Sequence, residues 1–108
     1  MRQLLNEDDL KDFLEGHLGE RVLIFKHSTQ CPISRAAYHQ VETFESENPG
    51  VPVGMIRVIE ERPLSLSFAD SVNVRHASPQ AVVLLDGHPV WNASHYDITA
   101  QALSDAVR

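Results

Sequence analysis

Apolar positions recur at helical spacing near the start of the chain and predict a first helix over residues 7–17. Apolar side chains then follow at helical spacing: Leu10, Phe13, Leu14 and Leu18. Asn6 is a good N-cap, and Asp9 stands three residues later in a capping-box position. Gly19 supplies a stop signal after the last apolar residue. The segment is therefore predicted to be an amphipathic helix with a marked beginning and end.

The same periodicity predicts further helices. One begins at Pro32, which suits a first helical turn because it lacks an N–H, and extends to about Glu47. Its apolar face holds Ile33, Ala37, Val41 and Phe44. A shorter helix is predicted over about 63–72, with an inward face of Leu64, Phe68 and Val72. Thr99 can cap a last helix that reaches about Val107.

Runs of β-branched and other apolar residues between these helices predict strands. The runs RVLIFK over 21–26 and VPVGMIRVI over 51–59 are typical of buried strands. Residues 81–85 and 88–92 flank Asp86-Gly87, which is a favoured two-residue turn, and they predict an antiparallel hairpin.

The predicted order of elements is αβαβαββα, with room for a short strand before the first helix. Strand–helix–strand units give parallel pairs through right-handed crossovers, whereas the final hairpin adds antiparallel strands. A mixed central sheet that is flanked by helices and ends in a hairpin is the thioredoxin-like α/β architecture. The chain has 108 residues, of which 43% are hydrophobic, so we expect a single domain over residues 1–108.

Composition narrows the choice of partners and of compartment. The formal net charge is −6 and no run of Lys or Arg offsets it, which argues against nucleic acid and anionic membranes as partners. No apolar run approaches the ~18 residues of a membrane span, and MRQLLNEDDL is too polar for a signal peptide. Because Cys31 is the only cysteine, no disulfide can form within the chain, and we expect a cytoplasmic protein.

Cys31 is the strongest candidate for a catalytic residue. It follows a buried strand and opens a helix, where N–H dipoles favour the thiolate, which is the nucleophilic form. His27, at the end of that strand, can add a positive charge or a hydrogen bond. The alternative is that Cys31 is a small buried apolar residue. Its position before the Pro32-initiated helix favours the reactive thiol.

Ser34 occupies the position that a second, resolving cysteine holds in a C-x-x-C motif. It cannot form a disulfide, although it can hydrogen-bond the sulfur or the helix N-terminus. A single chain therefore cannot carry out a dithiol cycle. A monothiol cycle stays open, in which Cys31 takes one partner of a mixed disulfide and an external thiol releases it.

Two further segments should lie beside the thiol. Ser78-Pro79 directly precedes a strand, and thioredoxin-like folds place a cis-proline next to the reactive thiol at this point. Residues 91–97 follow the hairpin to the same edge of the sheet. Their polar side chains are candidates for binding a polar ligand or for loop hydrogen bonds: Asn92, Ser94 and His95.

Other site chemistries find little support in the sequence. The six histidines and one cysteine show no zinc-type spacing, so no metal site is predicted. The chain has no glycine-rich phosphate loop and no G-x-S-x-G nucleophile elbow. We therefore expect no permanently bound cofactor.

Four segments of the chain are informative in combination: CPIS (31–34), IEERPLS (59–65), HASPQA (76–81) and VWNASHYDIT (90–99). In this order and at these spacings they resemble the monothiol bacilliredoxins, the YtxJ-like family. The resemblance covers nearly the whole chain and implies a thioredoxin-like fold with reversible thiol exchange with bacillithiol, a small cytosolic thiol. It also implies that Cys31 is the nucleophile and that Ser78-Pro79 is the cis-proline pair.

We therefore expect a monothiol thiol–disulfide oxidoreductase. Its partners would be S-thiolated cytosolic proteins and a low-molecular-weight thiol, bacillithiol or a similar one, as co-substrate. Two alternatives stay open. Monothiol glutaredoxins hold an Fe–S cluster between two chains, but their C-G-F-S motif has glycine where this chain has Pro32. The other alternative is a thioredoxin-like interaction module without catalysis, in which Cys31 is incidental.

Overall fold

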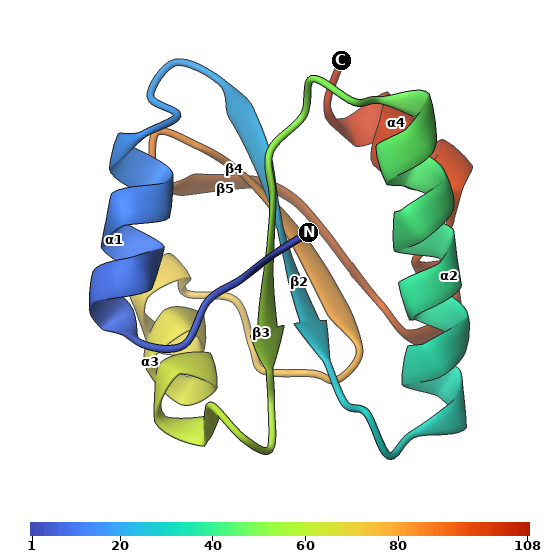
Figure 1. The fold of residues 1–108 in the computed structure, drawn as a ribbon, viewed down its shortest axis with the longest axis horizontal. Coiled ribbons are helices and arrows are strands. Elements are labelled where there is room, and N and C mark those ends of the chain that lie inside the picture. Colours follow the sequence, from blue (N-terminus) through green and yellow to red (C-terminus); the bar gives the residue numbers. More distant parts are fainter.

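A five-stranded sheet forms the middle layer of the computed structural model, which describes residues 1–108 (Figure 1). In chain order its strands are β1 (Arg2–Gln3), β2 (Arg21–His27), β3 (Val53–Arg57), β4 (Gln80–Leu85) and β5 (His88–Ser94). The helices are α1 (Glu7–Glu15), α2 (Pro32–Glu47), α3 (Arg62–Val72) and α4 (Ala100–Ala106), and a 3-10 turn η1 spans His95–Asp97. Helices α1 and α3 cover one face of the sheet, and α2 and α4 cover the other.

The predicted mixed sheet is confirmed. Its strand order is β1-β3-β2-β4-β5, with β3 parallel to both β1 and β2, and with β4 antiparallel to both β2 and β5. The predicted hairpin is confirmed as well, because Asp86 and Gly87 turn with φ values of 51° and 81°. Two positive φ angles in succession are the conformation that two-residue hairpin turns require.

The first helix begins as predicted but ends earlier. The Asn6 side chain accepts the N–H of Asp9 at 2.9 Å, which confirms the N-cap. The helix stops at Glu15, not at residue 17, because the chain caps at Gly16. Leu18, which continued the apolar spacing in the sequence, lies beyond the helix and is 67% exposed, so the apolar face of α1 does not extend to it.

The second parallel strand is also shorter than the predicted 51–59, since β3 covers Val53–Arg57. At its start Pro52 has no N–H for the ladder, although its carbonyl accepts the N–H of Leu23 at 3.0 Å. At its end the chain turns toward α3, where the Glu61 N–H donates to the Arg57 carbonyl at 2.8 Å.

Side chains of the central strand β2 alternate between two hydrophobic cores. Leu23 and Phe25 belong to the core under α2 and α4, and Val22 and Ile24 belong to the core under α1 and α3. Because the alternation continues, Lys26 falls on the α1–α3 side of the sheet and His27 on the α2 side.

Helix α2 departs from the predicted inner face in one position. Its buried residues are Ser34, Ala37, Val41 and Phe44, and Ile33 is only partly buried. The first turn of the helix therefore places a serine, and not the neighbouring isoleucine, against the end of β2.

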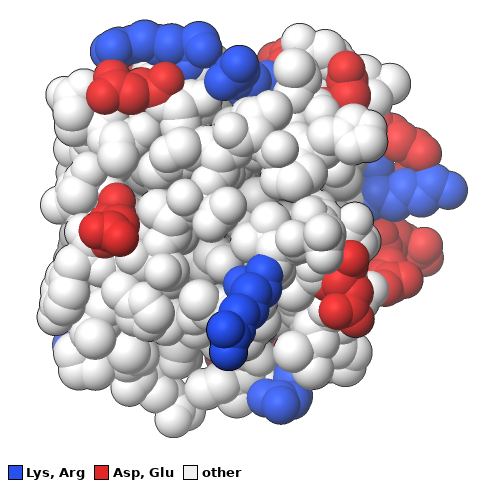
Figure 2. All heavy atoms as spheres, turned by 180° about the vertical axis from the view of Figure 1, so that it is seen from behind, with Lys and Arg blue, Asp and Glu red and all other residues white.

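The surface carries few charges on the side of the β5 edge. Seen from behind, most of this face is uncharged, and the acidic and basic side chains lie mainly along its margin (Figure 2). None of the helices combines the length and the apolar character that a membrane span requires.

Candidate active site

The end of β2 and the start of α2 present the single thiol. Cys31 is the N-cap residue of α2 in an extended conformation, and its carbonyl accepts the Arg35 N–H at 3.0 Å as the helix begins. The thiol is free and half-buried. Because β2 and β3 are parallel, the loop after β3 lies at the same edge, where the Val58 N–H donates to the His27 carbonyl at 2.9 Å.

Ser34 is fully buried, and its hydroxyl ties the thiol loop to the helix. Its Oγ accepts the backbone N–H of Ser28 at 2.8 Å and contacts His27 Nδ1, also at 2.8 Å. The prediction that this hydroxyl bonds the sulfur or the helix N-terminus is therefore wrong. The hydroxyl lies on the inner face of α2, so it meets the end of β2 instead.

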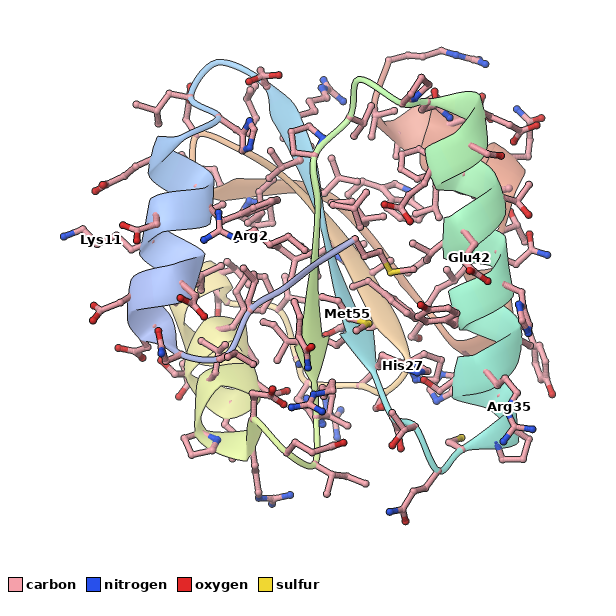
Figure 3. The ribbon with its side chains drawn as sticks, viewed as in Figure 1. Arg2, Lys11, His27, Arg35, Glu42 and Met55 are labelled. Carbon is pink, nitrogen blue, oxygen red and sulfur yellow. The ribbon has the colours of Figure 1, made fainter.

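His27 is buried between aromatic rings and points from the end of β2 toward α2 (Figure 3). Its ring centroid lies 5.4 Å from that of Phe25 and 5.0 Å from that of Tyr38. Burial lowers the pKa of His27, although the charge of Glu60 and the hydrogen bond with Ser34 oppose the shift. Burial therefore disfavours the positive charge, and of the two roles predicted for His27 the structure shows a hydrogen bond, with the Ser34 hydroxyl.

Ser78 and Pro79 lead into β4 at this same edge of the sheet. Their peptide bond is cis, and the Pro79 carbonyl accepts the His95 N–H at 3.1 Å. Gln80 pairs with Lys26 on β2 and with Ser94 on β5, so the start of β4 lies between the strand that leads to Cys31 and the end of the hairpin. The hydroxyl of Ser78 is buried and has no hydrogen-bond partner.

The predicted ligand residues of the hairpin divide into two groups. Ser94 and His95 lie at the edge beside Pro79, as the register and the His95 hydrogen bond show. Asn92 pairs with Val82, further from that edge, and is exposed. Its role in ligand binding stays a prediction that the position of its side chain does little to support.

Two basic residues at this end of the molecule were not predicted from the sequence to belong to the site. Lys26 is completely buried, and its Nζ lies 2.6 Å from Nδ1 of His76, in the segment before Ser78. Burial lowers the pKa of Lys26 to about 8. The signal was present in the pattern, because Lys26 ends a strand that is apolar on both faces and so had to be buried with it.

The chemistry available to this site is that of one thiol. Cys31 is the N-cap residue of a sixteen-residue helix, an end where backbone N–H groups face outward, and a thiolate is the nucleophilic form of cysteine. No group of three or more His, Cys, Asp or Glu side chains is placed to hold a metal ion. The arrangement therefore suits nucleophilic exchange at sulfur.

Known proteins share this fold and sequence pattern. A family model described as monothiol bacilliredoxin BrxC matches residues 2–103. A solved structure described as a candidate oxidoreductase with a thioredoxin fold is 36% identical and superposes with a TM-score of 0.91, covering 99% of this chain and 93% of that chain.

More distant structures confirm the thioredoxin fold alone. Thioredoxin from Fasciola hepatica is 21% identical with a TM-score of 0.82, over 99% of this chain and 96% of its own. The oxidised form of mitochondrial thioredoxin 3 from Saccharomyces cerevisiae is 17% identical with a TM-score of 0.77, over 99% of this chain and 92% of its own. The predicted thioredoxin-like α/β fold is thus correct.

Proposed function

Because the chain belongs to the monothiol bacilliredoxin family, we propose that it removes bacillithiol, or a similar low-molecular-weight thiol, from S-thiolated cytosolic proteins. Family and fold together support a thiol oxidoreductase. The observation that favours a monothiol cycle is the site itself. Cys31 is the only thiol, it is half-exposed at a helix N-terminus, and Ser34 fills the place of a resolving cysteine.

The first step transfers the small thiol to the enzyme. The Cys31 thiolate attacks the small-thiol sulfur of the mixed disulfide, a new Cys31 disulfide forms, and the protein–sulfur bond breaks. The substrate protein leaves as a thiolate, which takes a proton from solvent. The helix N-terminus stabilises the attacking thiolate before the step.

The second step returns Cys31 to its reduced form. A second molecule of the small thiol, as thiolate, attacks the small-thiol sulfur on Cys31 and leaves with it as a symmetric disulfide. Over the whole cycle one free small-thiol molecule is consumed, the protein thiol is released, and the two small-thiol units leave as a symmetric disulfide. No cofactor has to be bound for this cycle, and the small thiol is a co-substrate.

The surrounding residues have supporting roles in this proposal. Pro32 starts the helix at a position where a backbone N–H would have no partner within the helix. Ser34 and His27 hold the loop that presents the thiol. The edge formed by Ser78 and Pro79, together with Ser94 and His95, offers backbone and side-chain polar groups to a bound disulfide.

Intact-mass spectrometry tests the proposal. Reduced protein is mixed with a test protein that carries one bacillithiol on a single cysteine, and we expect a transient mass increase of one bacillithiol that maps to Cys31. The Cys31→Ser variant should form no adduct and should leave the test protein thiolated. If this variant removes bacillithiol as fast as the unsubstituted chain does, the mechanism is wrong. The same test protein thiolated with glutathione shows which small thiol is preferred.

A further inference from the structure

Lys26 is a buried cation without an anion. Its side chain is 0% exposed, its Nζ has one hydrogen-bond partner, His76 Nδ1 at 2.6 Å, and no carboxylate lies within ion-pair distance. Burial of an unpaired charge is strongly unfavourable, so buried ammonium groups normally have a carboxylate partner. The only other lysine of the chain, Lys11, is 71% exposed on α1.

More basic residues lie on α3 and on the segment that contains His76. Burial, followed by the positive charges of Lys26 and Arg62, lowers the pKa of His76, whose Nδ1 lies 2.6 Å from Lys26 Nζ. Arg75 precedes His76 in the chain. We refer to Lys26, Arg62, Arg75 and His76 as the basic cluster. None of its members forms an ion pair, although the chain has 15 acidic residues against 9 Lys and Arg.

A surface cavity adjoins the basic cluster. It lies between α3 and the segment 73–76, has a volume of about 630 Å³, and has Arg75 and His76 on its wall. This volume is in the range of small-molecule sites. One carboxylate, Asp70, also lines the cavity, but it makes no ion pair with either basic residue.

The basic cluster is connected to the thiol edge of the sheet. Lys26 pairs with Gln80 across β2 and β4, and the Gln80 side chain donates to the Arg75 carbonyl at 2.9 Å. His76 stands just before Ser78, whose buried hydroxyl has no partner, and the cis peptide bond to Pro79 follows. The segment that carries the cluster therefore ends where the mixed disulfide is proposed to dock.

We propose that the basic cluster binds the carboxylates of an anionic small thiol whose sulfur is held at Cys31. Arg62 and His76, which are exposed, donate to the carboxylates, and the Lys26 ammonium behind His76 adds its charge from the interior. This inference rests on the proposed function and deepens it, because it selects small thiols by their negative charge.

A comparison of two small thiols transferred to Cys31 tests the inference. A test protein carries either bacillithiol, whose malyl group has two carboxylates, or the uncharged 2-mercaptoethanol. We expect Arg62→Gln and Lys26→Met to lower kcat/KM about tenfold for the bacillithiol substrate, the loss of one charged hydrogen bond, and to leave the mercaptoethanol substrate unchanged. Equal losses on both substrates, or no loss on either, would overturn the inference.

Lys11→Gln is the matched control for removal of one positive charge. Lys11 lies on the outer side of α1, across the molecule from α2, and should change neither rate (Figure 3). If Lys26→Met does not fold, the two substrates are compared with Arg62→Gln and His76→Asn, which change exposed residues.

A binding measurement separates failure of the cluster from failure of the proposed function. If the chain turns over neither substrate, the proposed function is wrong, and citrate is titrated into the labelled chain while NMR follows the His76 ring. We expect a saturable shift that Lys11→Gln retains and Arg62→Gln loses. If the His76 ring does not respond, or responds equally in Arg62→Gln, carboxylate binding by the cluster is wrong whatever the redox activity.

Discussion

The hydroxyl of Ser34 accepts the N–H of Ser28 and contacts His27, both at 2.8 Å. A cysteine at this position would replace a strong acceptor with a weak one, because thiol sulfur is a poor hydrogen-bonding group. The serine of the C-x-x-S motif therefore has a structural role of its own. It fixes the loop between β2 and α2 that places Cys31 at the helix N-terminus.

Ser34→Ala should destabilise the fold. The substitution leaves the buried Ser28 N–H without its partner, and an unsatisfied buried donor costs about 1–3 kcal/mol. Urea denaturation should show this decrease in the free energy of unfolding. Ser46→Ala is the matched control, because Ser46 is exposed on the same helix, and its effect should stay within about 0.5 kcal/mol. Equal effects of the two substitutions would contradict the assigned role.

Single residues were predictable where local sequence determines their role. The position of Cys31 between β2 and α2 was predictable because a strand, a thiol and a proline-started helix are adjacent in the chain, and its catalytic role stays a prediction. The pairing of Lys26 with His76 was missed because it joins residues 50 apart, through a register and a loop conformation that no periodic pattern encodes. For His27 the sequence offered a positive charge or a hydrogen bond; the fold supplies the contact with Ser34, and burial at the end of β2 lowers the pKa of the imidazole.

At the scale of elements, the boundaries set by local capping were predictable and those set by packing were not. Asn6 and Thr99 cap their helices through their own side chains, as their sequence positions indicated. The C-cap of α1 is Gly16, and not the Gly19 that the pattern indicated as the stop, and Phe13 in the last turn packs on the sheet. Phe13 packs over β3 at Gly54, where a Cβ would lie 3.3 Å from the Phe13 ring, and the helix ends soon after this contact.

Gly54→Ala should lower the free energy of unfolding, because the added methyl group pushes β3 away from the side chains packed against it. An added Cβ would lie 2.8 Å from Leu4 Cδ1 and 3.2 Å from Ile24 Cδ1, both in the buried core. Overpacking of this kind costs about 1–3 kcal/mol, which thermal or urea unfolding would detect. The matched control is Gly50→Ala, just before the same strand, because its Cβ would meet nothing within 4 Å. A neutral Gly54→Ala would show that α1 and β1 adjust freely.

At the scale of the whole molecule, the thiol end gathers basic groups whose proton affinity is reduced by folding. Burial is the largest cause of the lowered pKa at Lys26, His27 and His76. The unfolded chain, in which these groups are hydrated, therefore binds more protons than the folded chain. Under that condition the stability of the fold rises with pH wherever one of these groups titrates.

The pH dependence of unfolding checks this linkage at Lys26. Its pKa is about 8 in the fold and 10.5 when unfolded, so the free energy of unfolding should rise between these pH values, by about 1–3 kcal/mol. Urea denaturation at a series of pH values should show the rise in the unsubstituted chain and in Lys11→Met, but not in Lys26→Met. The other groups titrate equally in all three proteins. If the free energy of unfolding changes with pH in the same way in all three, Lys26 is not held as a buried, unpaired ammonium.

The two histidines act in a separate range. Their folded-state pKa values lie below the ordinary 6.5, so acidification from about pH 6.5 should lower stability until the folded protein also takes up the protons. His27→Asn and His76→Asn should each flatten this acid limb without altering the alkaline one. Citrate should distinguish the two histidines. Because citrate is proposed to contact His76, it should reduce the acid decrease in stability that His76 causes. It should leave the contribution of the enclosed His27 unchanged. A citrate effect that persists in His76→Asn would place the anion elsewhere.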